Sequence, residues 1–238
     1  MDAPGLSIFF PCYNDARSIG ALVERADAVA SEFTPDYEII VVDDGSRDAS
    51  SDVLAALAAR FPRLRLVRHE RNEGYGAVLR SGFRNATQDW VFYTDGDGQY
   101  DVGELRAMLK LIGDDVDLVN GYRTARSDPA YRVAIGRLYQ WTMRRLFRFR
   151  LRDLSCDFRL IRRSALAAFE LHCSSGAICI ELVKKLELAG CRALDCPIRH
   201  YARPHGASEF FSPQPLLATA ADIVSLWWEF KGQMRGSG

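Results

Sequence analysis

Residues 90–99 have the sequence WVFYTDGDGQ, an apolar run followed by two carboxylates and a side-chain amide. The run is rich in residues that favour β-structure, so we expect a strand that carries Asp95, Asp97 and Gln99 at its end. Carboxylate and amide oxygens suit Mg²⁺ or Mn²⁺, ions that proteins bind through one or two carboxylates plus substrate phosphates. Because Asp and Gly are also common in turns, an acidic surface turn is the alternative.

Strands and helices alternate on both sides of this stretch. Apolar runs predict strands at 6–10, 37–42, 64–67, 117–121, 156–161 and 191–201, and helical spacing predicts helices at 18–33, around 53–58, at 75–86, 105–112, 178–188 and 216–230. Ser46 or Asp48 is the expected cap of the second helix. This alternation indicates an α/β fold, with a mostly parallel sheet covered by helices on both faces.

Polar motifs follow the strands expected at 6–10 and 37–42 and the strand that starts at Trp90, and one precedes the helix expected at 75–86. They are Pro11-Cys-Tyr13-Asn14, Asp43-Asp44, Asp95-Gly96-Asp97 and Asn72-Glu-Gly74. Ligands of parallel sheets bind outside the carboxyl ends of the strands, so one crevice could gather these motifs. No G-x-G-x-x-G follows the first strand, which argues against a dinucleotide-binding Rossmann domain.

Composition limits the kinds of partner and the cellular compartment that the protein is expected to have. The 238 residues have a formal net charge of zero, so no global charge indicates a nucleic-acid partner. The six cysteines show no CxxC spacing and are expected to be buried thiols in a reducing compartment. Neither a secretory signal nor an apolar run of transmembrane length is present, so we expect a cytoplasmic protein. The oligomeric state has no signature in the sequence.

Residues 123–152 contain nine arginines and one acidic residue, interleaved with large apolar side chains. Such a basic amphipathic segment suits an anionic membrane surface or a phosphate-bearing substrate, and the alternative is a solvated helical face. The helix expected at 216–230 has an apolar stripe that ends in Trp227 and Trp228. A stripe of this kind is typical of core packing, and the tryptophans also suit a helix that lies at a membrane interface.

Four segments, taken in order, resemble the family 2 glycosyltransferases of the GT-A fold. They are Pro11-x-Tyr13-Asn14, residues 41–46, Asn72-x-Gly74 and Asp95-x-Asp97-x-Gln99. Segments 121–123, 153–160 and 203–208 resemble the branch of dolichyl-phosphate mannosyltransferases and bacterial polyprenyl-phosphate glycosyltransferases. The resemblance covers roughly residues 6–212. It implies one catalytic domain at 1–212, with a nucleotide-sugar-binding half at 1–122 and an acceptor-binding half at 123–212, followed by a C-terminal amphipathic helix and tail at 213–238.

The resemblance also implies roles for individual residues. The implied nucleotide-sugar-binding residues are Pro11, Tyr13, Asn14, Asp43, Asp44, Asn72, Gly74, Asp95 and Gly96. The implied ligands of Mg²⁺ or Mn²⁺ are Asp95, Asp97 and Gln99. Binding of the acceptor phosphate or the leaving diphosphate falls to Arg123, Arg137, Arg203 and Ser208, with Asp97, Arg123 and Arg203 as the catalytic set. Two departures stand out: many relatives have Gly in place of Asp157, and some carry transmembrane helices after the catalytic domain.

The implied activity is inverting transfer of a sugar from GDP-mannose or a UDP-hexose to a polyprenyl or dolichyl phosphate, by a protein attached peripherally to the inner face of the cell membrane. A phosphate acceptor is already ionised, so it needs arginines more than a base. A soluble hydroxyl acceptor would need a general base, for which Asp157 and Glu181 are the candidates. A non-catalytic sugar-nucleotide-binding module is a third hypothesis, against which the intact metal-ligand set argues. No residue selects the base or the sugar.

Overall fold

The computed structural model describes residues 3–126, 130–203 and 213–233. The strands are β1 (Leu6–Cys12), β2 (Tyr37–Asp43), β3 (Leu64–Arg68), β4 (Trp90–Thr94), β5 (Leu118–Arg126), β6 (Phe158–Arg162) and β7 (Ala193–His200). The helices are α1 (Ile19–Phe33), α2 (Ser50–Arg60), α3 (Tyr75–Asn85), the 3₁₀ turn η1 (Val102–Glu104), α4 (Leu105–Leu109), α5 (Ala130–Phe147), α6 (Arg163–Leu166), α7 (Ile178–Leu188) and α8 (Pro213–Phe230). Each predicted strand and helix is present, with boundaries shifted by a few residues.

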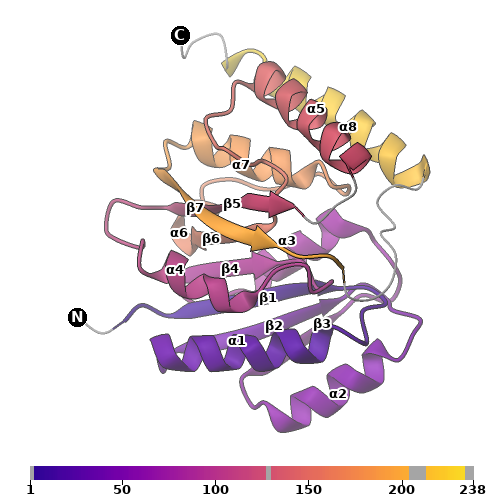
Figure 1. Ribbon diagram of the computed structural model, residues 1–238, viewed down its shortest axis with the longest axis vertical. Coiled ribbons are helices and arrows are strands. Elements are labelled where there is room, and N and C mark those ends of the chain that lie inside the picture. The colour runs from indigo at the N-terminus through magenta and orange to yellow at the C-terminus, as the bar shows by residue number, and fades with distance from the viewer. Residues whose placement is uncertain (1–2, 127–129, 204–212, 234–238) are drawn as a thin grey trace.

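The seven strands form one sheet in the order β3-β2-β1-β4-β6-β5-β7 (Figure 1). The pairs β1–β2, β2–β3, β1–β4 and β5–β7 are parallel, while β6 runs antiparallel to both of its neighbours. The prediction of a mostly parallel α/β sheet is therefore confirmed. The chain first adds strands outward from β1 and then returns through α3 to place β4 on the other side of β1. This reversal is where open α/β sheets form a binding crevice.

Two apolar clusters cover the two faces of the sheet. Along β1, Ile8 and Phe10 enter the cluster that includes α1 and α4, whereas Phe9 enters the cluster that includes α3 and α7. Because alternate residues of a strand point to opposite faces, a strand buried on both sides becomes a continuous apolar run. The strands that lead to the crevice are thus held rigidly from both faces.

The start of α2 differs from the prediction. Ala49 occupies the cap position, and Ser46 instead accepts a hydrogen bond of 3.0 Å from the backbone N–H of Asn14. Asp48 accepts from the N–H of Ser50 at 2.9 Å, one position outside the cap. Ser46 is used to join the loops that follow β1 and β2, which the local pattern of the helix does not reveal.

The predicted burial of the cysteines is confirmed for all but Cys191, which is partly exposed. None of the helices in the described parts of the chain combines the length and the apolarity needed to cross a bilayer.

Candidate active site

The loop after β4 carries Asp95, Gly96 and Asp97 and is fastened to the end of β1. A Cβ on Gly96 would overlap the carbonyl oxygen of Pro11, so only glycine fits between the two aspartates. The hydroxyl of Ser18 donates to the carbonyl oxygen of Gly96 at 2.7 Å and holds the loop from the side of α1. The two carboxylates therefore stand at the switch point of the sheet, where the sequence predicts them.

Gln99 ties this loop to the segment after β7. Its Nε2 donates to the carbonyl oxygen of Tyr201 at 3.1 Å, and the N–H of Tyr201 donates to the carbonyl oxygen of Gln99 at 2.9 Å. Oδ1 of Asp97 accepts from the N–H of Gln99 at 3.0 Å. The side-chain oxygen is the atom of Gln99 that could bind a cation, because an amide nitrogen only donates hydrogen bonds.

Several carboxyl groups lie close to one another around Asp95 and Asp97. Burial raises the pKa of Asp95 well above its usual value, and the charges of Asp157 and Asp97 add to the rise, against the hydrogen bond from Tyr75. Burial likewise raises the pKa of Asp97, although the N–H of Gln99 and the guanidinium of Arg203 oppose it. A bound cation would relieve this repulsion between carboxylates.

The side chains of this loop suit a divalent metal whose remaining ligands come from a substrate and from water. In the described residues, no group of three or more His, Cys, Asp or Glu side chains forms a ligand cluster. Asp95, Asp97 and Gln99 instead offer two carboxylates and an amide oxygen. This is the partial set that suits Mg²⁺ or Mn²⁺ when phosphates and water complete the coordination.

Arg203 reaches into this loop, and Asp15 is its partner. Its Nη2 lies 3.1 Å from Oδ1 of Asp15, and its Nη1 lies 4.0 Å from Oδ2 of Asp97. Burial raises the pKa of Asp15, and the charge of Arg203 works in the opposite direction. The sequence interpretation missed Asp15, although its place directly after Tyr13 and Asn14 at the end of β1 was a usable signal.

The residues predicted to hold the nucleotide link the loops after β1, β2 and β3. Asn14 has a left-handed backbone, with φ of 57°, and its side-chain oxygen accepts from the N–H of Arg47 at 2.8 Å. Oδ1 of Asp43 accepts from the N–H of Ser46 at 3.0 Å. Pro11, Asp43 and Asp44 are buried, Tyr13 is partly exposed, and Asn72 is exposed.

Asp44 turns inward and shapes the loop that contains Asn72 and Gly74. Its carboxylate accepts from the N–H groups of Glu73 and Gly74 at 2.9 and 3.0 Å, and Nδ1 of His69 lies 2.6 Å away. Only 3% of the Asp44 side chain is exposed, so its contribution to a nucleotide site passes through the loop that it holds.

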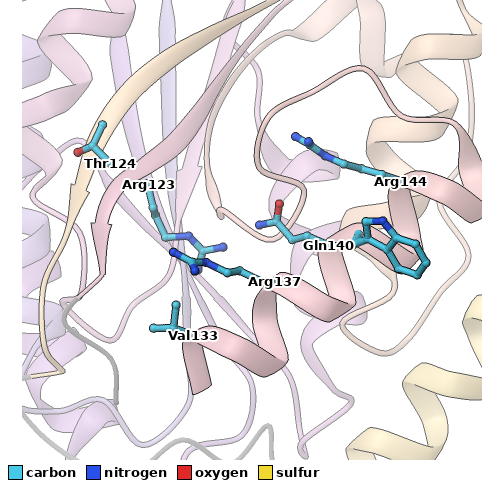
Figure 2. A pocket seen from close by; sticks show the side chains of 7 residues that line it. Arg123, Thr124, Val133, Arg137, Gln140 and Arg144 are labelled. Atoms are coloured by element: carbon cyan, nitrogen blue, oxygen red, sulfur yellow. The ribbon is translucent and has the colours of Figure 1, made fainter. Parts of the chain in front are cut away.

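Arg123 and Arg137 line one groove of about 460 Å³ between the end of β5 and α5 (Figure 2). Its other lining residues are Thr124, Val133, Gln140, Trp141 and Arg144. Arg123 is fixed by Asp153 through two bonds of 2.8 Å, from Nε to Oδ2 and from Nη2 to Oδ1. Arg137 is exposed on α5 and points into the same space.

The predicted phosphate-binding set is thus divided between two places. Arg123 and Arg137 meet in the groove, whereas Arg203 lies beside Asp15 and Asp97. Arg144 also lines the groove, but its Nη2 donates to the carbonyl oxygens of Leu151 and Arg152. Ser208 lies outside the described residues.

Glu181, one candidate base for a hydroxyl acceptor, is fully buried. Burial raises its pKa, but Lys185 and the N–H groups of His172 and Cys173 lower it more, and the net pKa is below the usual value. Hydrogen bonds of 2.7 to 3.0 Å join these groups to its carboxylate. A base stabilised in its charged form is a weak proton acceptor, so Glu181 is suited to holding the loop at 172–173.

Asp157, the other candidate base, belongs to a buried network. Its Oδ1 accepts from Nη1 of Arg159 at 2.8 Å, from the hydroxyl of Tyr93 at 3.3 Å and from the thiol of Cys179 at 3.0 Å. Arg159 is fully buried and also donates to Asn120. Asp157 therefore compensates a buried guanidinium beneath the crevice.

A switch-point crevice with an Asp-x-Asp loop, in a sheet of this order, is the arrangement of a GT-A glycosyltransferase. The chain belongs to glycosyl transferase family 2, whose model matches residues 7–169.

A curated relative, an undecaprenyl-phosphate 4-deoxy-4-formamido-L-arabinose transferase from Edwardsiella ictaluri, is 30% identical over 207 residues. The match covers 86% of this chain and 62% of that protein, so the chain spans less than two thirds of the relative's length.

Two solved structures share the fold. Glucosyl-3-phosphoglycerate synthase from Mycobacterium tuberculosis, in complex with Mn²⁺, UDP-glucose and phosphoglyceric acid, has a TM-score of 0.66 at 18% identity, with 94% of this chain and 80% of that chain covered. A mannosyltransferase from Pyrobaculum calidifontis, in complex with GDP-mannose and Mn²⁺, has a TM-score of 0.64 at 19% identity, with 94% and 65% covered.

Proposed function

We propose that the protein transfers a sugar, with inversion, from a nucleotide-diphosphate donor to a polyprenyl or dolichyl phosphate. The observation that carries the proposal is the meeting of Asp97 and Arg203 at the switch point, within 4.0 Å of each other. A carboxylate that can hold a metal and a guanidinium that can hold a phosphate then flank the same position. Complexes of the solved relatives with UDP-glucose or GDP-mannose and Mn²⁺ support a sugar-nucleotide donor.

The donor half, residues 1–122, would bind the nucleotide sugar through the loops after the first four strands. The residues proposed to bind it are Pro11, Tyr13, Asn14, Asp43, Asn72, Gly74, Asp95 and Gly96, with Asp44 acting through the loop that it holds. Asp97 and Gln99, with Asp95, would hold Mg²⁺ or Mn²⁺, and the ion would supply Lewis-acid stabilisation of the departing diphosphate. Arg203, held by Asp15, would donate to the same diphosphate as its negative charge grows.

The acceptor half, residues 123–212, would bind a phosphate in the groove of Arg123 and Arg137, with Ser208 as a further donor. An oxygen of the ionised acceptor phosphate attacks the anomeric carbon, and the bond from that carbon to the donor diphosphate breaks with its electron pair. No proton has to be removed, which agrees with the structural roles of Glu181 and Asp157. The name of the Edwardsiella relative, an undecaprenyl-phosphate transferase, supports a lipid phosphate as the acceptor.

We propose further that the outer surface of α5 and α8 rests on the inner face of the cell membrane. Of the ten large hydrophobic side chains exposed in the described residues, seven lie on these two helices. They are Ile135, Leu138, Trp141, Leu216, Leu217, Val224 and Trp228. The helices contact each other and lie side by side (Figure 1).

Of the two interpretations of the apolar stripe of α8, core packing holds for only part of the helix. Leu217, Val224 and Trp228 are exposed, and Leu226 and Phe230 are buried in their place. Trp141 belongs both to this surface and to the groove, where Arg137 and Arg144 are among the other lining residues. A lipid phosphate could therefore enter the groove while its chain stays in the bilayer.

A transfer assay with matched acceptors tests the function. The purified protein is incubated with Mn²⁺, a panel of UDP- and GDP-sugars, and either a short-chain polyprenyl phosphate or the corresponding polyprenol. We expect release of UDP or GDP with the phosphate and not with the alcohol. Equal transfer to the alcohol would favour a hydroxyl acceptor, and no use of any donor with either lipid would contradict the proposal.

A further inference from the structure

Tyr75, the first residue of α3, donates a hydrogen bond to the metal loop. Its hydroxyl lies 2.7 Å from Oδ1 of Asp95, in the loop after β4. A phenol donor at this distance makes a strong bond to a carboxylate. One oxygen of Asp95 is thereby engaged, and the orientation of the carboxylate is restricted.

The backbone on both sides of Tyr75 is fixed. Gly74 has a φ of 92°, a conformation that favours glycine, and its N–H donates to Asp44 at 3.0 Å. The N–H of Gly76 donates to the carbonyl oxygen of Ser174 at 3.0 Å, and a Cβ on Gly76 would overlap the carbonyl oxygen of Cys173. The two flanking glycines therefore fix the backbone position of Tyr75.

The ring and the hydroxyl of Tyr75 have separate roles. The ring packs against the apolar cluster on the α3 and α7 face of the sheet, a role that phenylalanine would also fill. The hydroxyl reaches a carboxylate that is surrounded by further carboxylates at Asp97 and Asp157. In metal sites, hydrogen bonds to the ligating carboxylates set their direction and strengthen binding of the ion.

We infer that Tyr75 is a positioning residue for Asp95, an assignment that rests on the proposed function because it takes Asp95 as a metal ligand. The Tyr75 hydroxyl holds Oδ1, so that Oδ2 is presented to a divalent cation and to the diphosphate that the cation carries. Removing the hydroxyl leaves a carboxylate that can rotate away from the ion. The loss should therefore fall on metal affinity, and an excess of metal should restore turnover.

The test compares Tyr75→Phe with Tyr37→Phe, which removes a bond of the same kind far from the crevice. Tyr37 begins β2 and donates to Oδ1 of Asp27, also at 2.7 Å. Mn²⁺ is titrated calorimetrically into each protein with saturating UDP and, in parallel, with saturating GDP. Asp95→Asn serves as the reference for loss of the ligand itself, and thermal unfolding in EDTA measures the stability of each variant.

We expect Tyr75→Phe to weaken Mn²⁺ binding about 10-fold, with kcat at saturating Mn²⁺ close to that of the unchanged protein. Tyr37→Phe should leave Mn²⁺ affinity unchanged even if it lowers the melting temperature. Unchanged affinity in Tyr75→Phe beside weakened affinity in Asp95→Asn would overturn the role of Tyr75 alone. Unchanged affinity in Asp95→Asn, or no Mn²⁺-dependent binding of either nucleotide, would overturn the metal site on which that role depends.

Discussion

The guanidinium of Arg203 lies 4.0 Å from the carboxylate of Asp97, although the two residues follow different strands, β7 and β4. Neither strand neighbours the other in the sheet, so it is the loops beyond them that bring the two charges together. A diphosphate bound through a metal at Asp97 would lie within reach of Arg203. The leaving group would then be stabilised from two sides.

Arg203→Ala should reduce kcat about 100-fold, because a donor to a developing oxyanion contributes most in the transition state. The folded protein should lose little stability, since the ion pair with Asp15 is partly exposed. Steady-state transfer kinetics and thermal unfolding measure the two effects. Arg60→Ala, which removes an exposed pair with Glu24 at a distance from the crevice, is the control. Equal kcat in the two variants would contradict the role of Arg203.

Arg137→Gln should raise KM for a polyprenyl phosphate about 10-fold, as expected for loss of one charge-assisted hydrogen bond. KM for the sugar nucleotide should not change. The side chain is exposed, so the fold should tolerate the change. Arg145→Gln, on the same helix but outside the groove lining, is the matched variant. An unaltered KM for the lipid in Arg137→Gln would remove this residue from the acceptor site.

Arg123→Ala should behave differently from Arg137→Gln, because it also leaves Asp153 without its bidentate partner. The side chains of the pair are 10% and 7% exposed, so we expect a loss of about 3 kcal/mol in the free energy of unfolding. Urea unfolding of the variant and of the unchanged protein measures this loss. Stability equal to that of Arg137→Gln would show that the pair does not hold the end of β5.

Glu38, on β2, should make stability depend on pH at a site remote from the crevice. Burial raises its pKa, but bonds from Thr87, Ser7 and Arg65 lower it more, and the folded pKa lies below the ordinary 4.5. Its stabilising contribution is present above that ordinary value and is lost as the pH falls through the folded pKa. Glu38→Gln should cost about 2 kcal/mol at neutral pH.

Urea unfolding at several pH values checks this prediction, with exposed Glu24→Gln as the control. The difference between the unchanged protein and Glu38→Gln should be full at neutral pH and should shrink as the pH falls below 4.5 and through the folded pKa. A difference that stays constant over this range would contradict the account of Glu38.

Leu138→Glu combined with Leu217→Glu should reduce binding to anionic vesicles about 10-fold or more, since each leucine contributes apolar area to a bilayer contact. Flotation with vesicles of phosphatidylglycerol and phosphatidylcholine measures the bound fraction. Leu111→Glu combined with Leu188→Glu changes exposed leucines outside α5 and α8. Equal losses in the two double variants would contradict a specific membrane-facing surface.

The sequence predicted the parts of the fold that depend on local pattern. The apolar runs of β1 and β4 and the polar residues after them lie as expected, because strand burial and strand ends are readable from neighbouring residues. The antiparallel direction of β6 was not predicted. It is determined by long-range pairing with β4 and β5, which hydrophobic alternation does not encode.

The positions of the candidate site residues were predictable to a similar degree. Asp97 and Gly96 follow from a motif, but the partners of the arginines do not, because Asp15 and Asp153 meet Arg203 and Arg123 only through tertiary contacts. The hydroxyl of Tyr75 reaches Asp95 for the same reason. What the local pattern missed is mainly the set of residues that hold others in place.

Asp97→Ala tests the central claim most directly, because it removes the proposed metal ligand at little cost to the fold. Burial raises the pKa of Asp97, so its charge is unfavourable in the folded protein without a cation and its loss should not destabilise that state. Sugar transfer is measured with Mn²⁺, with Mg²⁺ and in EDTA, beside thermal unfolding. We predict a folded variant with no metal-dependent turnover. Full activity of Asp97→Ala in EDTA would contradict the account.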